Sequence, residues 1–234
     1  MSERDRNRNG IGLGLALTAL SGLTMLTAIV MVFRYAPREA TMGDVQRIFY
    51  FHVSSAWVGF LAFLITALGG LLYLIKGQRR WDALALSSVE VGLTFITMAV
   101  VTGSLWAGAA WGTYWTWEPR LTISAIQLMI YVAYLMLRRA LDNPEMRARF
   151  AAAYGIVASV TVPLSWFAIR WWRTIHPDVL TGGESMAITP RMLHTLLVSL
   201  AAFSLLYVTL LLARLRLERA RDALDAVRRR FGAD

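Results

Sequence analysis

Cysteine is absent from the 234 residues, and histidine occurs only three times. The lack of cysteine excludes disulfide bonds, thiol–disulfide exchange, thiolate-ligated metal sites and covalent attachment of a cofactor through a C-x-x-C-H motif. Any imidazole chemistry must therefore use His52, His176 or His194. The chain is also too short to hold a large soluble domain beside several membrane spans.

Charged residues are scarce, at 17%, whereas 57% of the residues are hydrophobic and the mean hydropathy is +0.50. Soluble domains have about 25% charged and roughly 45–50% apolar residues, so the composition indicates a bilayer protein. Six apolar stretches approach the roughly 20 residues that cross about 30 Å of hydrocarbon. They lie near 12–33, 53–75, 83–105, 121–137, 151–169 and 193–213. The first is longer than a signal-peptide h-region and no clear cleavage site follows it, so we expect an anchored span.

The distribution of basic residues predicts the orientation of these spans. Seventeen of the 24 Lys and Arg residues fall in the N-terminal arm, the 76–82 and 138–150 loops and the tail 214–234, on one side of the predicted membrane. The positive-inside rule therefore places both termini in the cytoplasm. The same clustering explains the net charge of +9 through contact with anionic membrane lipid, and no nucleic-acid-binding motif is visible.

The predicted fold class is an all-α integral membrane protein. We expect a bundle of six transmembrane helices, both termini cytoplasmic, that forms one membrane domain over 1–234. It would have a tryptophan-rich periplasmic loop at 106–120 and a basic tail at 214–234 that continues the last span as an inner-surface helix.

Histidine and tryptophan collect on the predicted outer side. His52 lies at the outer mouth of the second span, His176 just beyond the fifth, and His194 at the start of the sixth. Eight of the nine tryptophans are also outer. Anchoring in lipid headgroups accounts for Trp57 and Trp166, but an aromatic belt normally marks both interfaces. The one-sided loading therefore indicates a further role for the other tryptophans.

The periplasmic loop holds the densest aromatic cluster. If 111–118 is helical, Trp111, Trp115 and Glu118 share one face of that helix. We expect Pro119 either to end this helix or to begin the next one. The result would be a rigid aromatic shelf at the membrane surface.

Such a shelf would carry the carboxylate of Glu118 and the guanidinium of Arg120 at its edge. Indole faces give dispersion contact at low entropy cost, and arginine binds a carboxylate through two parallel hydrogen bonds. The shelf therefore suits a large flat apolar ligand with charged substituents. Two imidazoles nearby favour a metalloporphyrin, since haem iron accepts one axial nitrogen on each face. Their position at the rim favours capture and transfer over electron conduction across the membrane.

Three segments resemble the haem-handling proteins of cytochrome c maturation. The run WGTYWTWEPRLT at 111–122 is similar to their tryptophan-rich signature, and its RLT ending resembles the CcmC (haem exporter protein C) branch more than the CcmF and CcsA branches. YFHVSSAW at 50–57 resembles the first histidine motif of the family, and WWRTIH at 171–176 resembles the second. With six spans and three outer loops, the resemblance covers nearly the whole chain.

The resemblance implies a protein that binds and delivers haem and is not an enzyme. It implies that His52 and His176 are the axial ligands of a haem b bound non-covalently and transiently. The haem-binding surface that it implies comprises Trp111, Gly112, Trp115, Trp117, Glu118 and Arg120. The haem would be presented at the periplasmic face of a bacterial inner membrane to a CcmE-type chaperone. The other implied partners are a CcmD-like small membrane protein and the CcmA–CcmB ABC transporter.

Three positions depart from the family pattern. Glu118 stands where the signature usually has aspartate, Ser54 replaces a proline common after the first histidine, and Tyr114 stands where tryptophan is frequent. The longer arm of Glu118 keeps the charge but moves it further from the backbone. We therefore expect the fine geometry of haem contact to differ.

Two other classes of function stay open on the residues alone. An outer-face zinc metalloenzyme would use the three histidines, although H-E-x-x-H is absent and no nearby general base can be nominated. A membrane transporter would have polar groups along its spans and broken helices at the midplane. Only Glu90 stands out there, and it is assigned no role. We expect Pro163 to kink the fifth span, and His194 to pack or to act as a secondary donor.

Overall fold

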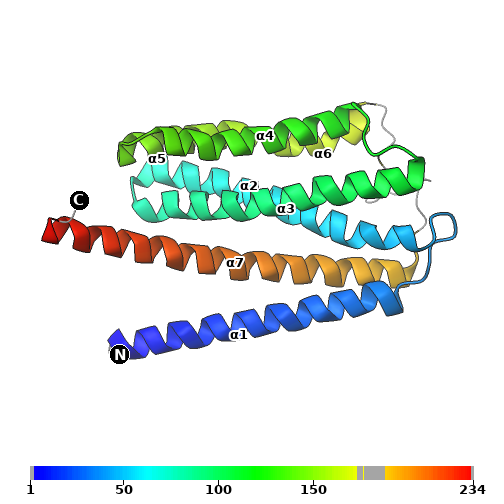
Figure 1. The fold of residues 1–234 in the computed structure, drawn as a ribbon, viewed down its shortest axis with the longest axis horizontal. Helices are drawn as coiled ribbons and strands as arrows, with labels where there is room; N and C mark the ends of the chain where they lie inside the picture. The colour runs from blue at the N-terminus through cyan, green and yellow to red at the C-terminus, as the bar shows by residue number, and fades with distance from the viewer. Residues whose placement is uncertain (1–2, 173–175, 177–187, 233–234) are drawn as a thin grey trace.

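The computed structural model describes residues 3–172, 176 and 188–232, with side chains from Gly12 onward. Within these ranges the regular structure is helical, apart from one isolated bridge between Glu39 and Gly43. The elements are α1 (Glu3–Val30), the π-helical turn η1 (Met31–Tyr35), the 3-10 turn η2 (Asp44–Arg47), α2 (Ile48–Lys76), α3 (Arg79–Trp111), α4 (Pro119–Ala140), α5 (Pro144–Ala158), α6 (Thr161–Trp171) and α7 (Pro190–Phe231) (Figure 1).

Six helical segments are long and apolar enough to cross a membrane, which confirms the predicted all-α fold of a multi-pass membrane protein. The fifth segment consists of α5 and α6, which are separated by Ser159 and Val160. Pro163 explains the break, because it has no N–H to bond the carbonyl of Ser159 and its ring would clash with that carbonyl in a continuous helix. The fifth span is therefore interrupted just before the proline.

The helices extend beyond the apolar stretches of the sequence. α2 begins at Ile48 and not near residue 53, so His52 lies inside the helix, in its second turn. At 1.5 Å per residue the 42 residues of α7 measure about 63 Å, roughly twice the hydrocarbon thickness. α7 continues to Phe231 without a break (Figure 1). The basic tail therefore continues the last span as helix, and its position at the inner membrane surface stays a prediction.

Three helices begin with a proline, which is pre-organised for the first helical position because its N–H is not needed there. They are α4 at Pro119, α5 at Pro144 and α7 at Pro190. Asn143 caps α5 by accepting two backbone N–H groups at 2.9 and 3.0 Å. Thr189 caps α7 by accepting one at 3.4 Å.

α2 is the central helix, packed along α3 and also against α5 and α7. Small residues let the helices approach closely, which supplies the van der Waals contact that drives association in lipid. A Cβ at Gly92 of α3 would lie 2.7 Å from the Cβ of Ala62 in α2. Phe63 of α2 stacks on Tyr131 of α4 with ring centroids 3.5 Å apart. These contacts fix α3 and α4 against the central helix.

Both ends of the described chain lie at the same end of the bundle (Figure 1). We call this the inner end, and we call the opposite end, with the start of α2, the end of α3 and the start of α4, the outer end. α1 lies along α7. That the inner end faces the cytoplasm remains a prediction from the basic residues.

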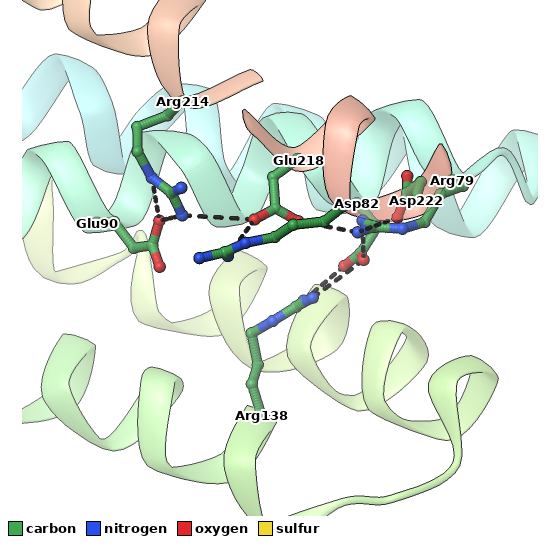
Figure 2. A network of polar contacts seen from close by, with 8 residues as sticks. Arg79, Asp82, Glu90, Arg138, Arg214, Glu218 and Asp222 are labelled. Carbon is green, nitrogen blue, oxygen red and sulfur yellow. Dashed lines mark hydrogen bonds and ion pairs between the residues drawn. The ribbon is translucent and has the colours of Figure 1, made fainter. Parts of the chain in front are cut away.

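A network of ion pairs at the inner end joins α3, α4 and α7 (Figure 2). Asp82 accepts two hydrogen bonds from Arg138, at 2.5 and 3.0 Å, and one from Arg79 at 2.9 Å. Arg79 also donates to Glu218 of the α7 tail at 3.0 Å. The side chains of Asp82 and Arg138 are only 6% and 7% exposed. Buried charges of this kind persist only when they are paired, so the network holds the tail onto the bundle.

Glu90, to which the sequence assigned no role, belongs to the same network. The Nε of Arg214 donates to its carboxylate at 2.8 Å, and Nη2 of Arg214 contacts both Glu90 and Glu218 (Figure 2). An acid within a span needs such a partner, and here the tail of α7 supplies it.

Candidate functional site

His52 faces α3 from the second turn of α2. Its Nδ1 lies 2.8 Å from the carbonyl oxygen of Ala99 and 3.5 Å from the hydroxyl of Thr102. Because a carbonyl only accepts hydrogen bonds, Nδ1 carries the proton and the lone pair is on Nε2. Gly103 makes this position possible, since a Cβ there would lie 2.7 Å from Cε1 of His52. The imidazole is therefore held in one tautomer and one orientation.

His176, between α6 and α7, lies beside His52. The two ring centroids are 6.2 Å apart and the ring planes are inclined at 45°. With metal–nitrogen bonds of about 2 Å, two imidazoles on opposite sides of one iron have ring centres roughly 6 Å apart. The rings are close enough to share one metal.

Two adjoining cavities meet at this pair of histidines. The larger has a volume of about 440 Å³ and extends between α2, α6 and α7. The smaller, of about 60 Å³, extends between α2, α3 and the loop that precedes α4. Both are lined by His52, Ala56, Phe60, Arg120 and His176. The larger volume falls within the roughly 300–1,000 Å³ usual for ligand sites.

Arg120, in the first turn of α4, supplies a cation to both cavities. Its Nη1 donates to the hydroxyl of Ser165 at 2.7 Å and also to the Ser165 carbonyl. Its guanidinium lies 5.7 Å from the centre of the Phe60 ring. The hydrogen bonds that the guanidinium of Arg120 makes to other described residues are all donated by Nη1. Its Nε and Nη2 can therefore donate to a carboxylate.

The helix over 111–118, which was the condition for an aromatic shelf with Trp111, Trp115 and Glu118 on one face, does not form. α3 ends at Trp111, and Gly112 follows in the left-handed region with φ of 71°, which glycine adopts without strain. The chain then folds back along α3, where Ser104 donates to the carbonyl of Tyr114 at 2.8 Å. Pro119 begins the next helix. Helical spacing over eight residues could not reveal that Gly112 would stop the helix.

The loop nevertheless brings part of the predicted surface to the cavities. Trp111 and Trp115 line the smaller one. Trp117 is 78% exposed and touches Trp115 edge-on, with centroids 5.8 Å apart. Gly112 forms the turn and Glu118 immediately precedes α4. Of the predicted haem-binding residues at 111–118, Trp111 and Trp115 therefore line a cavity, whereas Gly112, Trp117 and Glu118 shape the loop or lie exposed on it.

Other lining residues were missed from the sequence. Trp57, Trp166 and Arg170 line the larger cavity, although the two tryptophans were interpreted as headgroup anchors. Trp57 donates from Nε1 to the hydroxyl of Ser204 at 3.1 Å, which joins α2 to α7. In the sequence, the excess of tryptophans on the outer side was the signal that could have pointed to Trp57 and Trp166 as lining residues.

His194 stands apart from the histidine pair. Its Nδ1 is 3.3 Å from the hydroxyl of Tyr35, and neither cavity includes it. Across the described ranges, no three His, Asp or Glu side chains come together as a metal site. The zinc-enzyme alternative, which needs all three histidines, therefore has no geometric support there. Arg173, within the WWRTIH segment, lies outside the described residues.

Fold and site together define a class of protein: a multi-pass helical membrane protein with an apolar cavity at one end of its bundle, equipped with paired imidazoles and an arginine. The family model described as "CcmC: Heme exporter protein C" matches residues 12–230. The chain belongs to this family.

Relatives from several bacteria support the match. The Heme exporter protein C of Bradyrhizobium diazoefficiens is 33% identical over 213 residues, which cover 87% of this chain and 80% of the relative. That of Rhodobacter capsulatus is 30% identical, over 92% of this chain and 89% of the relative. That of Escherichia coli K12 is 30% identical, over 85% and 80% respectively.

Proposed function

We propose that the protein binds haem at the outer end of its bundle and delivers it to a periplasmic chaperone of the CcmE type during cytochrome c maturation. The family's name, Heme exporter protein C, supports a role in haem handling. Haem is here a cargo that the protein holds and releases unchanged, not a substrate for catalysis. The cargo is a haem b bound non-covalently and transiently, and the absence of cysteine agrees with this.

The pair of imidazoles carries the proposal. A centroid separation of 6.2 Å suits His52 and His176 as the two axial ligands of one iron. The hydrogen bond from Nδ1 of His52 to Ala99 leaves Nε2 free to ligate and raises its basicity. Bound iron supplies the Lewis acid, and the protein supplies two oriented nitrogen donors.

The surrounding residues suit the rest of the cargo. The two apolar cavities that meet at the pair offer room for a flat macrocycle, and Trp111 and Trp115 give it aromatic contact. In this proposal Arg120 binds a haem carboxylate through Nε and Nη2. Gly112 and Glu118 shape the loop and its charge. Trp117, exposed at the surface, contacts the haem edge or the incoming chaperone.

Location and partners complete the proposal. The excess of basic residues at the inner end supports a bacterial inner membrane with both termini cytoplasmic and the site at the periplasmic face. The partners are a CcmE-type chaperone, a CcmD-like small membrane protein and the CcmA–CcmB ABC transporter. The assignment to the family is what supports these partners.

The test is haem titration of the purified full-length protein. Wild type should give the absorption spectrum of low-spin haem with two histidine ligands, and His52→Ala and His176→Ala should each change it. His194→Ala is the matched control and should keep the wild-type spectrum, because His194 bonds Tyr35 away from the cavities. If both ligand variants kept an unchanged spectrum, the assignment of the ligands would be wrong.

A further inference from the structure

We propose that haem reaches the histidine pair sideways, from the outer leaflet of the membrane, through a cleft between α6 and α7. This inference rests on the proposed function and adds the source of the cargo and its path to the iron-binding side chains. It concerns the mouth of the larger cavity, where the walls are membrane-spanning helices.

The larger cavity has α2 as its floor and α6 and α7 as its walls. Its walls are lined by Trp166, Ile169, Leu196, Leu200, Ala201 and Ser204. α6 packs on α4 and α2, while α7 packs on α1, α2 and α3, and the two walls make little or no contact with each other. The cavity therefore has no helix covering it between its walls among the described residues.

Side-chain exposure shows that the cleft opens sideways. Trp57 on the floor is 46% exposed and Trp166 on the α6 wall is 39% exposed. Ala201 on the α7 wall is exposed as well. All three belong to segments that are apolar enough to span a membrane, so what they meet outside the protein is lipid. The mouth of the cleft is therefore continuous with the hydrocarbon region.

The chemistry of the mouth fits haem in transit. Two indoles, from Trp57 and Trp166, offer flat apolar faces to a porphyrin ring, whose apolar area favours lipid over water. The hydrogen bond of Trp57 to Ser204 holds one of these indoles in place. Further in, the same cavity presents Arg120 and the two histidines. A molecule that slides in from lipid thus meets its carboxylate partner and its axial ligands in one continuous space.

Passage along the axis of the bundle is opposed by tight packing below the cavity. Phe63, Tyr131 and Tyr134 are fully buried there, and Phe63 and Tyr131 are stacked. Beyond them, the buried pair of Asp82 and Arg138 belongs to the ion-pair network at the inner end (Figure 2). Moving haem through this region would break a packed core and a buried charge pair, whereas sideways access breaks neither.

The test uses the full-length protein in lipid vesicles whose outer leaflet carries haemin. Ala201→Trp places an indole at the mouth of the cleft, and Ala201→Leu is a smaller, graded change. Val208→Trp is the matched control, because Val208 lies two turns further along the same face of α7, is 41% exposed and does not line the cavity. The rate at which the two-histidine spectrum appears is followed by stopped-flow absorption. Its final form, after long incubation in detergent with haemin, reports whether the site has folded.

We expect Ala201→Trp to slow loading from the vesicles at least tenfold and Ala201→Leu to slow it less, each compared as the rate constant of the spectral change, which does not depend on its final amplitude. Val208→Trp should load at the wild-type rate. The sideways path is overturned if Ala201→Trp loads as fast as wild type, or if Val208→Trp is slowed equally. A wild-type protein that never develops the two-histidine spectrum from any source of haem overturns the proposed function itself, which is a different result.

Discussion

Gly103→Ala tests the proposed ligation of haem through a residue that touches no ligand. The added methyl carbon would lie 2.7 Å from Cε1 and 3.0 Å from Nδ1 of His52. Such contacts are too short to persist, so the imidazole must move. Its hydrogen bond of 2.8 Å to the carbonyl of Ala99 is then stretched or lost. The side chain would keep its nitrogen donor but lose the partner that orients it.

The expected loss follows from what such orienting partners contribute. Removing one typically weakens metal affinity by about 10–100-fold, which corresponds to roughly 1.4–2.7 kcal/mol. Alanine is favoured over glycine within a helix by about 0.8–1.0 kcal/mol, so the intrinsic helical preference of α3 does not fall. The variant should therefore fold and bind haem more weakly, with a reduced low-spin fraction.

The assay is titration of Gly103→Ala with haemin, followed by its absorption spectrum and dissociation constant. Gly22→Ala in α1 is the matched control, because a Cβ there would meet nothing within 4 Å. It makes the same chemical change without the clash and should bind haem as wild type does. A Gly103→Ala protein with wild-type affinity and spectrum would refute the role given to His52.

Two further perturbations address the arginine and the inner end. Arg120→Ala should weaken haem binding by about 1.5–3 kcal/mol, the contribution of hydrogen bonds to a charged group. It should scarcely affect the binding of haem dimethyl ester, which has no free carboxylate, and paired titrations with the two ligands would measure the difference. An equal loss of affinity for both ligands would contradict the carboxylate contact. Asp82→Asn leaves Arg138 buried without its counter-charge and should destabilise the protein by about 3–5 kcal/mol, seen as a lower thermal unfolding temperature in detergent. The control for Asp82→Asn is Glu145→Gln, which breaks the exposed ion pair with Arg149 and should change stability by less than about 1 kcal/mol. Equal shifts of the unfolding temperature in the two variants would show that the buried network contributes little to stability.

The spans could be predicted because crossing a bilayer is a requirement on neighbouring residues. The apolar character of a run such as 53–75 can be read without knowing the rest of the fold. Such a run must form a helix in the bilayer, because lipid offers no hydrogen-bond partner for the backbone N–H and C=O groups. Helix ends were less predictable. α2 begins at Ile48, five residues before the predicted span, because helical hydrogen bonding does not stop where a predicted apolar stretch is drawn and continues through Tyr50 and His52.

The loop after α3 shows where a local pattern misleads. The spacing of Trp111, Trp115 and Glu118 fits one face of a helix, yet Gly112 turns the chain and Tyr114 folds back over Gly108. A Cβ at Gly108 would lie 2.4 Å from that ring. The loop is thus shaped by a contact with the preceding helix, which spacing within the loop does not encode.

Membrane insertion, helical content and the chemical types available to the site follow from composition and order along the chain, because each depends on residues close together in the sequence. The pairing of His52 with Ala99 spans 47 residues, that of Arg120 with Ser165 spans 45, and that of Glu90 with Arg214 spans 124. Such pairs form only after helices have packed, since packing selects which faces meet. The sequence therefore indicated an imidazole-based site, while helix packing set its hydrogen bonds and its two cavities.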